Sequence, residues 1–397
     1  MIRIIKRIFR GILALILLAV VIVVLVLAIN VDFSNPKNLD TFVQGKIKKA
    51  EIPGLSVAFI RNGKLDEIKN YGYYDVEQNK PVTENTIFQI ASVSKTITAT
   101  AVMQLVEKGL IDLDGDINRY LPFPIRHPEY PDTPLTIRML LTHTSGIANN
   151  WDVYESFYTT SSGGGDSPVS LEQFVEGFLS PGGTWYDPQN NFVPGKPGTV
   201  ANYSNPAYAL LGYLVEEVTQ MPFDDYCKKA IFEPLEMDRT AWLLKDTDLL
   251  EKAIPYDLKN NPLPHYSFAS YPDGALKVST KDFSSFILAI MNDGKYKDKT
   301  LLNPDTLEEM FRPQADEGKQ ALMWDYSIPE SLLMNDFSGR QLVGHTGSDP
   351  GIFTFVLFNR ETKNGLIFFS NKELDLNVKT VNTYLLVRRL IREAGLV

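Results

Sequence analysis

The chain of 397 residues contains one cysteine, Cys227, and only four histidines. A single cysteine excludes an internal disulfide and a structural zinc site built from four cysteines. The histidines are widely separated, and none belongs to a His-Glu-x-x-His pattern. The sequence therefore predicts a protein without disulfides, and we expect neither a metal ion nor another cofactor in its site.

Positive charge is scarce over most of the chain. The formal net charge is −9, and four basic residues (Arg3, Lys6, Arg7 and Arg10) precede the first acidic residue, Asp32. Without these four charges the remainder carries −13. Such an acidic body argues against nucleic acid as a partner, because nucleic-acid binding relies on clustered basic residues.

Charged residues are absent from one long stretch near the N-terminus. Residues 12–29 form an uninterrupted apolar run of 18 residues, which is long enough to span a bilayer. The preceding basic residues place the N-terminal side in the cytoplasm. The sequence predicts a cytoplasmic stub over 1–10, a transmembrane anchor over 11–30 and a linker over 31–40. We thus expect a single-pass protein of the cell membrane with an extracytoplasmic body; a cleaved signal peptide is the alternative.

Strand patterns occur at both ends of the body, and helical patterns fill its middle. Residues 54–75 indicate two strands joined at Asn62-Gly63, a strong hairpin signal. Residues 340–373 indicate three more strands with glycine-rich turns. Strands so distant in sequence can share one antiparallel sheet if the segment between them, roughly 85–280, is an inserted all-helical subdomain. We expect one domain over 41–397, with a catalytic cleft between its two parts.

The stretch FQIASVSKTITATAVMQLVEKG, residues 88–109, contains a Ser-x-x-Lys pattern at the first turn of an expected helix. Ser92 and Lys95 are three residues apart, so both lie on one face of that helix. A serine hydroxyl becomes a nucleophile when a neighbouring group takes its proton, and a partly desolvated lysine can do this or relay the proton. An ordinary helix-capping serine produces the same local pattern. The interpretation therefore depends on partners elsewhere in the chain.

Two further motifs supply candidate partners. Tyr203-Ser204-Asn205 lies between a Pro/Gly-rich loop and an apolar helix, and His345-Thr346-Gly347 lies in the C-terminal strand region. His143, at the end of the expected helix over 135–147, is interpreted as a structural hydrogen-bonding residue. In this order and at these separations, the Ser92 motif and the two partner motifs resemble those of the penicillin-recognising serine hydrolases. The resemblance is to the class C β-lactamase and DD-carboxypeptidase branch, and it covers residues 38–397.

The resemblance implies a mixed α/β (α+β) fold of the β-lactamase/transpeptidase type and a reaction through an acyl-enzyme. It implies that Ser92 attacks a carbonyl group while Lys95 and Tyr203 share the proton transfers. Which of these two takes the proton first stays open. Asn205 would hydrogen-bond the Lys95 ammonium or a substrate amide.

The third motif is implied to lie beside the substrate. The backbone N–H groups of Ser92 and Ser348, the residue after Gly347, would form the oxyanion hole. His345 and Thr346 would line the substrate side of the strand. Class C β-lactamases usually carry lysine at the position of His345, and histidine is mostly neutral at pH 7.

The histidine shifts the expected substrate away from penicillins. We expect a serine hydrolase that acts on small D-amino-acid peptides of the cell-wall type or on related amides and esters. A β-lactamase, an esterase and a non-catalytic binding protein that keeps the fold are the alternatives. The expected partners are this small substrate and the lipid bilayer, and nucleic acid is not among them.

Overall fold

The computed structural model describes most of the body of the protein. The described residues are 16–17, 19–247, 251–315, 319–328, 341–374 and 377–396. The expected cytoplasmic stub, 1–10, lies outside them, as does part of the expected anchor, whose described residues 16–17 and 19–30 are helical. In the described part of the chain, no helix combines the length and apolar character needed to cross a membrane. The anchor over 11–30 therefore stays a prediction.

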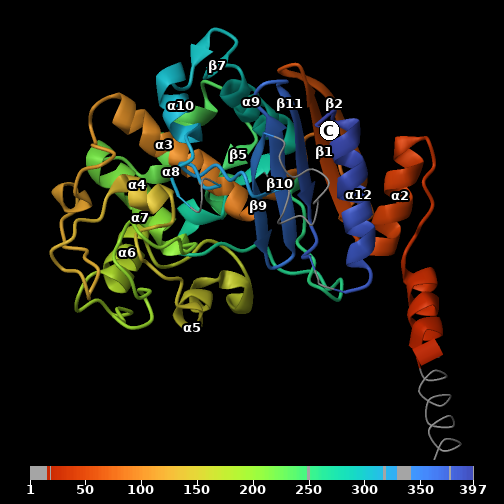
Figure 1. Cartoon of the computed structure of the whole chain (residues 1–397), viewed down its shortest axis with the longest axis horizontal. Coiled ribbons are helices and arrows are strands. Elements are labelled where there is room, and N and C mark those ends of the chain that lie inside the picture. The colour runs from red at the N-terminus through yellow and green to blue at the C-terminus, as the bar shows by residue number, and fades with distance from the viewer. Residues whose placement is uncertain are drawn as a thin grey trace, which may run out of the picture.

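A six-stranded antiparallel sheet joins the two ends of the body, as the sequence predicts (Figure 1). The first two long strands form the predicted hairpin through Asn62 and Gly63, whose φ angles of +50° and +71° suit a tight two-residue turn. Leu55 in the first strand pairs with Ser370 in the last strand. The strand order is β3-β2-β1-β11-β10-β9, with bounds β1 Gly54–Arg61, β2 Lys64–Asp75, β3 Lys80–Pro81, β9 Leu342–Asp349, β10 Ile352–Asn359 and β11 Asn364–Ser370.

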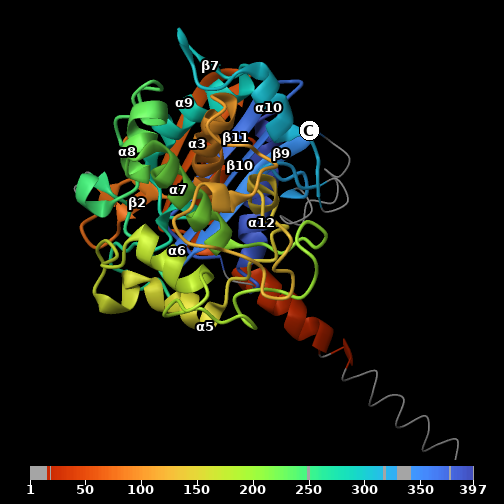
Figure 2. The ribbon, with the colours of Figure 1, turned by 90° about the vertical axis from the view of Figure 1, so that its left-hand side faces the viewer.

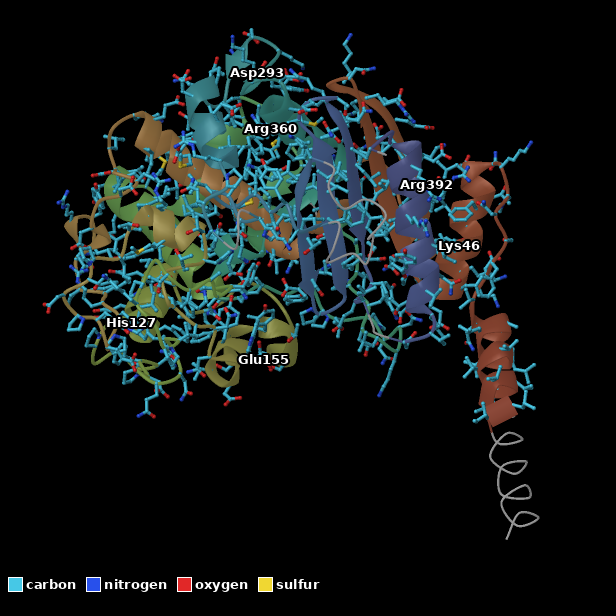
Figure 3. All side chains as sticks on the ribbon, in the orientation of Figure 1. Lys46, His127, Glu155, Asp293, Arg360 and Arg392 are labelled. Carbon is cyan, nitrogen blue, oxygen red and sulfur yellow. The ribbon has the colours of Figure 1, made fainter. Side chains whose placement is uncertain are left out.

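Helices cover both faces of this sheet, so its central strands are buried on both sides. Alternate residues of β1 enter two different cores: Val57 and Phe59 face one, Ala58 and Ile60 the other. The first core is closed by α2 (Leu39–Ala50) and α12 (Thr380–Glu393), the outer layer in Figure 1. Lys46 on α2 and Arg392 on α12 mark this layer in Figure 3.

The larger core lies between the opposite face of the sheet and the helical part of the molecule, which faces the viewer in Figure 2. The helix α9 packs against β1, β2 and β11 from this side. The helices of this part are α3 Lys95–Glu107, α4 Ile137–Leu141, α5 Trp151–Tyr154, α6 Leu171–Leu179, α7 Asn205–Thr219, α8 Phe223–Cys227, α9 Thr280–Met291 and α10 Pro304–Phe311.

The expectation of an all-helical insertion over roughly 85–280 is wrong in one respect. Three short strands, β4 (Ile87–Gln89), β5 (Thr240–Ala241) and β6 (Lys277–Ser279), form a small sheet of order β4-β6-β5 within it. Segments of two or three residues are too short to show a period of two, and their partners are distant in sequence. A further hairpin, β7 (Lys295–Tyr296) with β8 (Lys299–Thr300), follows α9.

Candidate active site

Ser92 lies in a 3-10 turn, η1 (Ala91–Ser94), that runs directly into α3. The helix behind it is buried from Lys95 to Leu105, so this helix is held by packing on all sides. Ala91 has a φ of +48°, which is uncommon for a residue with a Cβ atom. Ala91 is fully buried, whereas Ser92 is half-buried. The turn therefore presents the Ser92 hydroxyl toward solvent from a rigid base.

The Lys95 side chain connects the first two motifs. Its Nζ atom donates hydrogen bonds to Ser92 Oγ at 3.0 Å, to Asn205 Oδ1 at 2.8 Å and to the backbone oxygen of Asp273 at 2.6 Å. The side chain is completely buried. Asn205 is the first residue of α7, and α7 packs against α3. Helix packing therefore brings together residues that are 110 positions apart.

Tyr203 lies at the open side of this group, with 42% of its surface exposed. Lys95 Nζ is 5.0 Å from the centre of the Tyr203 ring. The ring of His143 lies 4.4 Å from the Tyr203 ring, between centroids. His143 also holds the loop through two hydrogen bonds, because its carbonyl accepts from the Asn202 N–H at 2.7 Å and its Nδ1 accepts from the Ser204 N–H at 3.1 Å.

The structural interpretation of His143 is thereby confirmed. Burial and, to a smaller extent, the Lys95 charge hold the pKa of His143 well below its ordinary value. The ring is therefore neutral, as an acceptor for the Ser204 N–H must be. Its backbone adopts a φ of +57°, which turns the chain out of α4. His143 thus packs against the Tyr203 ring and holds the backbone on both sides of it.

Asn149 is a further support of the second motif. Its Oδ1 accepts a hydrogen bond from the Asn205 N–H at 2.8 Å, and its Nδ2 donates to the carbonyl of Tyr203 at 3.1 Å. One side chain thus bridges the two ends of the Tyr203-Ser204-Asn205 motif. Asparagine suits this place because its amide is both a donor and an acceptor.

The third motif lies on β9, the strand at one edge of the described sheet. The backbone N–H and C=O of Gly344 bond to Asp325, so they point away from β10. Backbone direction alternates along a strand, so the same groups of Thr346 and Ser348 also point away from β10. Ser348 is exposed. Its N–H is therefore available beside the Ser92 turn, against which β9 packs.

Gly347 brings β9 close to the turn that carries Ser92. A Cβ atom at this position would lie 2.5 Å from the Ile90 carbonyl oxygen and 3.2 Å from Ala91 Cβ. The Thr354 hydroxyl on β10 donates to the same Ile90 oxygen at 2.7 Å. A side chain larger than glycine would therefore separate the strand from the turn.

His345 is a neutral residue of this strand. Only 7% of its surface is exposed, and its Nδ1 lies 2.6 Å from the carbonyl oxygen of Thr346, to which the protonated nitrogen donates. Burial, with the Lys95 charge, lowers the pKa of His345 to about 4. The ring centroids of His345 and Tyr203 are 6.4 Å apart. The structure thus brings all three motifs around one point.

Comparison with known proteins supplies the family. The sequence profile of the family described as Beta-lactamase matches residues 39–388. The chain belongs to the beta-lactamase family. This agrees with the resemblance derived from the three motifs, and the mixed α/β fold expected from it is confirmed.

Family members with curated descriptions differ considerably from this chain in sequence. Protein flp from Staphylococcus aureus (strain MRSA252) is 26% identical over 344 residues, which cover 85% of this chain and 63% of the relative. The chain thus spans less than two thirds of that protein's length. Penicillin-binding protein 4* from Bacillus subtilis (strain 168) is 24% identical over 364 residues, covering 85% of this chain and 72% of the relative.

Solved structures of the family superpose on nearly the whole body. An octameric penicillin-binding protein homologue from Pyrococcus abyssi matches with a TM-score of 0.66 and 25% identity, covering 89% of this chain and 77% of that one. A Beta-Lactamase/D-Alanine Carboxypeptidase from Pseudomonas syringae matches with a TM-score of 0.68 and 24% identity, covering 88% and 98%. At 24% identity this second likeness shows the fold alone.

Two carboxylates beside the motifs were missed by the sequence reasoning. Asp273 Oδ1 is 4.0 Å from Lys95 Nζ, and the Tyr154 hydroxyl donates to its other oxygen. Asp349 accepts a hydrogen bond from the Tyr158 hydroxyl at 2.8 Å. Burial raises the pKa of Asp273 to about 6 and that of Asp349 to about 7.

The sequence gives different amounts of information about these residues. Asp349 follows the third motif almost directly, so its proximity could have been inferred. Asp273 and Asn149 belong to none of the three motifs. Lys95 and Asp273 are 178 positions apart, and neither sequence period nor spacing connects them.

Proposed function

We propose that the protein is a serine hydrolase that acts through an acyl-enzyme on Ser92. The observation that carries this proposal is the contact of Lys95 Nζ with both Ser92 Oγ and Asn205 Oδ1. An ordinary capping serine does not require a fully buried lysine beside its hydroxyl. The exposed Tyr203 next to this pair adds the second group that proton transfer needs.

The proposed reaction has two steps. Ser92 Oγ forms a bond to the substrate carbonyl carbon, and the pair of Lys95 and Tyr203 transfers its proton to the leaving group as the C–N or C–O bond breaks. The oxyanion is held by the N–H groups of Ser92 and Ser348. In the second step, water attacks the acyl-enzyme while the same groups transfer its proton, and the free acid is released. The leaving group departs on the Tyr203 side, where the ring is exposed.

The substrate class we propose is a small D-amino-acid peptide of the cell-wall type or a related amide or ester. The neutral ring of His345 favours amides and esters that carry no carboxylate at this position, because a permanent cation that would attract a carboxylate is missing from that position of β9. The names of the Pyrococcus penicillin-binding protein homologue and of penicillin-binding protein 4* support an amide substrate of the penicillin type or of the related cell-wall type. A β-lactamase and an esterase are the competing activities.

The test compares wild type with Ser92→Ala. The protein from Asp32 onward is incubated with a fluorescent penicillin and a fluorophosphonate probe, and labelling is read on a gel. Wild type is expected to label and Ser92→Ala is expected to lose all labelling and turnover. A second arm supplies D-alanyl-D-alanine peptides, nitrocefin and p-nitrophenyl esters. Turnover of nitrocefin alone would support a β-lactamase, and turnover of esters alone an esterase.

Ser34→Ala serves as a matched control, because Ser34 also precedes a lysine by three residues but lies outside any helix, in the segment before α2. This variant is expected to label like wild type. A wild type that reacts with neither probe overturns the proposal and leaves a binding protein that has kept the fold.

We also propose that the apolar N-terminal segment anchors the protein in the cell membrane with its body outside. Support comes from the described part of that segment, where most large apolar side chains are 42–67% exposed and so lack a protein partner that covers them. The full chain is expected to sediment with membranes and to dissolve only in detergent. A variant that begins at Asp32 is expected to remain in the supernatant, and equal sedimentation of both would contradict the anchor.

A further inference from the structure

The charge balance around Lys95 needs an anion that the three motifs do not supply. An ammonium group has three donors, and Lys95 uses them on Ser92, Asn205 and the Asp273 carbonyl. All three acceptors are uncharged oxygen atoms. A fully buried cation is costly unless a charge of opposite sign lies nearby. The Asp273 carboxylate is such a charge, with Oδ1 at 4.0 Å from Lys95 Nζ.

A hydrogen-bonded chain orients this carboxylate. The Tyr154 hydroxyl donates to Asp273 Oδ2, and since it has only one hydrogen, the Ser270 hydroxyl at 2.6 Å donates to the Tyr154 oxygen. Tyr154 is fully buried and Asp273 is 2% exposed. The donation to Oδ2 stabilises the ionised form and leaves Oδ1 toward Lys95. Asp273 thus holds Lys95 twice, through its carbonyl and through its side chain.

We propose that Asp273 is the buried counter-ion of Lys95, positioned by Tyr154, and that it keeps Lys95 charged while Tyr203 carries the proton of Ser92. This inference rests on the proposed function for its kinetic part only. With Lys95 donating in three directions, its nitrogen has no lone pair to accept a proton. Tyr203 is then the group left to accept it. Asp273 is a positioning residue in this scheme, because it touches Lys95 and not the substrate.

Several other titratable groups face Lys95 and act on its charge. Both histidines among them are neutral by burial. The second carboxylate, Asp349, is bonded to Tyr158 and not to Lys95. The groups from the elements packed around Lys95 are Tyr203 and Tyr208 of the α7 region, His143 at the end of α4, His345 and Asp349 of β9, and Asp273 itself.

A double-mutant cycle on stability tests the ion pair without relying on activity. Asp273→Asn, Lys95→Met and the double variant are unfolded in urea at pH 7.5. Asp273→Asn keeps the backbone acceptor and leaves a buried cation unpaired, so it is expected to favour unfolding strongly. In the Lys95→Met background the same change is expected to raise the unfolding equilibrium constant by a factor that is at least about fivefold smaller. Additive effects would overturn the counter-ion.

The kinetic arm measures the rate of Ser92 labelling by a fluorophosphonate from pH 5 to pH 10. Asp273→Asn is expected to react at least about tenfold more slowly and to lose activity on the alkaline side about one pH unit earlier, because a cation without its counter-charge loses its proton more readily. Tyr154→Phe removes one hydroxyl only and is expected to shift the profile in the same direction by less. Asp298 is exposed, and Asp298→Asn should give the labelling rate and pH profile of wild type.

The outcomes separate the two proposals. A gain of activity near neutral pH in Asp273→Asn would mean that neutral Lys95 is the base, and it would overturn the assignment to Tyr203. Superimposed profiles for wild type, Asp273→Asn and Tyr154→Phe would overturn the positioning role. If wild type never labels but the stability cycle still shows coupling, the ion pair stands and the proposed hydrolase fails.

Discussion

At the scale of single residues, the protonation state of His345 distinguishes this site from one that carries a cation at the same position. A pKa lowered to about 4 leaves the ring neutral from pH 7.5 down to about pH 5. Over that range the preference of the enzyme among acidic and neutral substrates should therefore not change through this residue. A hydrogen bond from its Nδ1 to the Thr346 carbonyl ties the ring to its own strand.

A lysine in place of His345 should change that preference. We expect His345→Lys to raise the acylation rate by a penicillin, which bears a carboxylate, relative to a neutral p-nitrophenyl ester by about tenfold, because the new ammonium attracts the carboxylate. Stopped-flow acylation with both substrates measures this ratio. The neutral variant His345→Gln is the control. Equal ratios in the lysine and glutamine variants would show that this position does not contact the carboxylate.

At the scale of elements, the site depends on how closely β9 approaches the turn that carries Ser92. Gly347 permits this approach, and Thr354 on the neighbouring strand fixes the Ile90 carbonyl between them. Ser92 and Ser348 come from elements more than 250 residues apart in sequence. Their separation in space is set by a contact between backbones.

Gly347→Ala should disrupt this contact. The added Cβ would lie 2.5 Å from both the Ile90 oxygen and Thr354 Oγ1, so the strand must move. We expect acylation to slow about 100-fold through misplacement of the Ser348 N–H and stability to fall by about 1–3 kcal/mol. Labelling kinetics and urea unfolding measure the two effects. Gly163→Ala, which meets no atom within 4 Å although its φ is +90°, should keep its activity.

At the scale of the whole molecule, two cores on opposite faces of one sheet separate stability from chemistry. The core under α2 and α12 contains no residue of the three motifs. Leu390, on α12, is fully buried in it. Leu390→Ala should therefore lower the free energy of unfolding by about 2–5 kcal/mol while leaving kcat/KM of the folded enzyme unchanged. A matching loss of kcat/KM at a temperature where the variant is fully folded would contradict this separation.

The sequence predicts the parts of the molecule that local pattern determines. The hairpin at Asn62-Gly63, the three C-terminal strands and the fold implied by the three motifs are confirmed in the structure. The small sheet β4-β6-β5 and the Tyr154–Asp273 hydrogen bond were not predicted. The pairing of β4 with β6 and the Tyr154–Asp273 contact each join segments more than a hundred positions apart without a repeating pattern, so only the packed chain brings them together.

The pairing of β1 with β11 has a consequence for biosynthesis. Leu55 leaves the ribosome more than three hundred residues before its partner Ser370, and the strand that carries Ser348 is also among the last to be made. Contacts between such distant segments form slowly, and until they form, one edge of β1 has no partner strand. The nascent chain therefore carries Ser92 long before it carries Ser348. The proposed site can be complete only when synthesis is nearly finished.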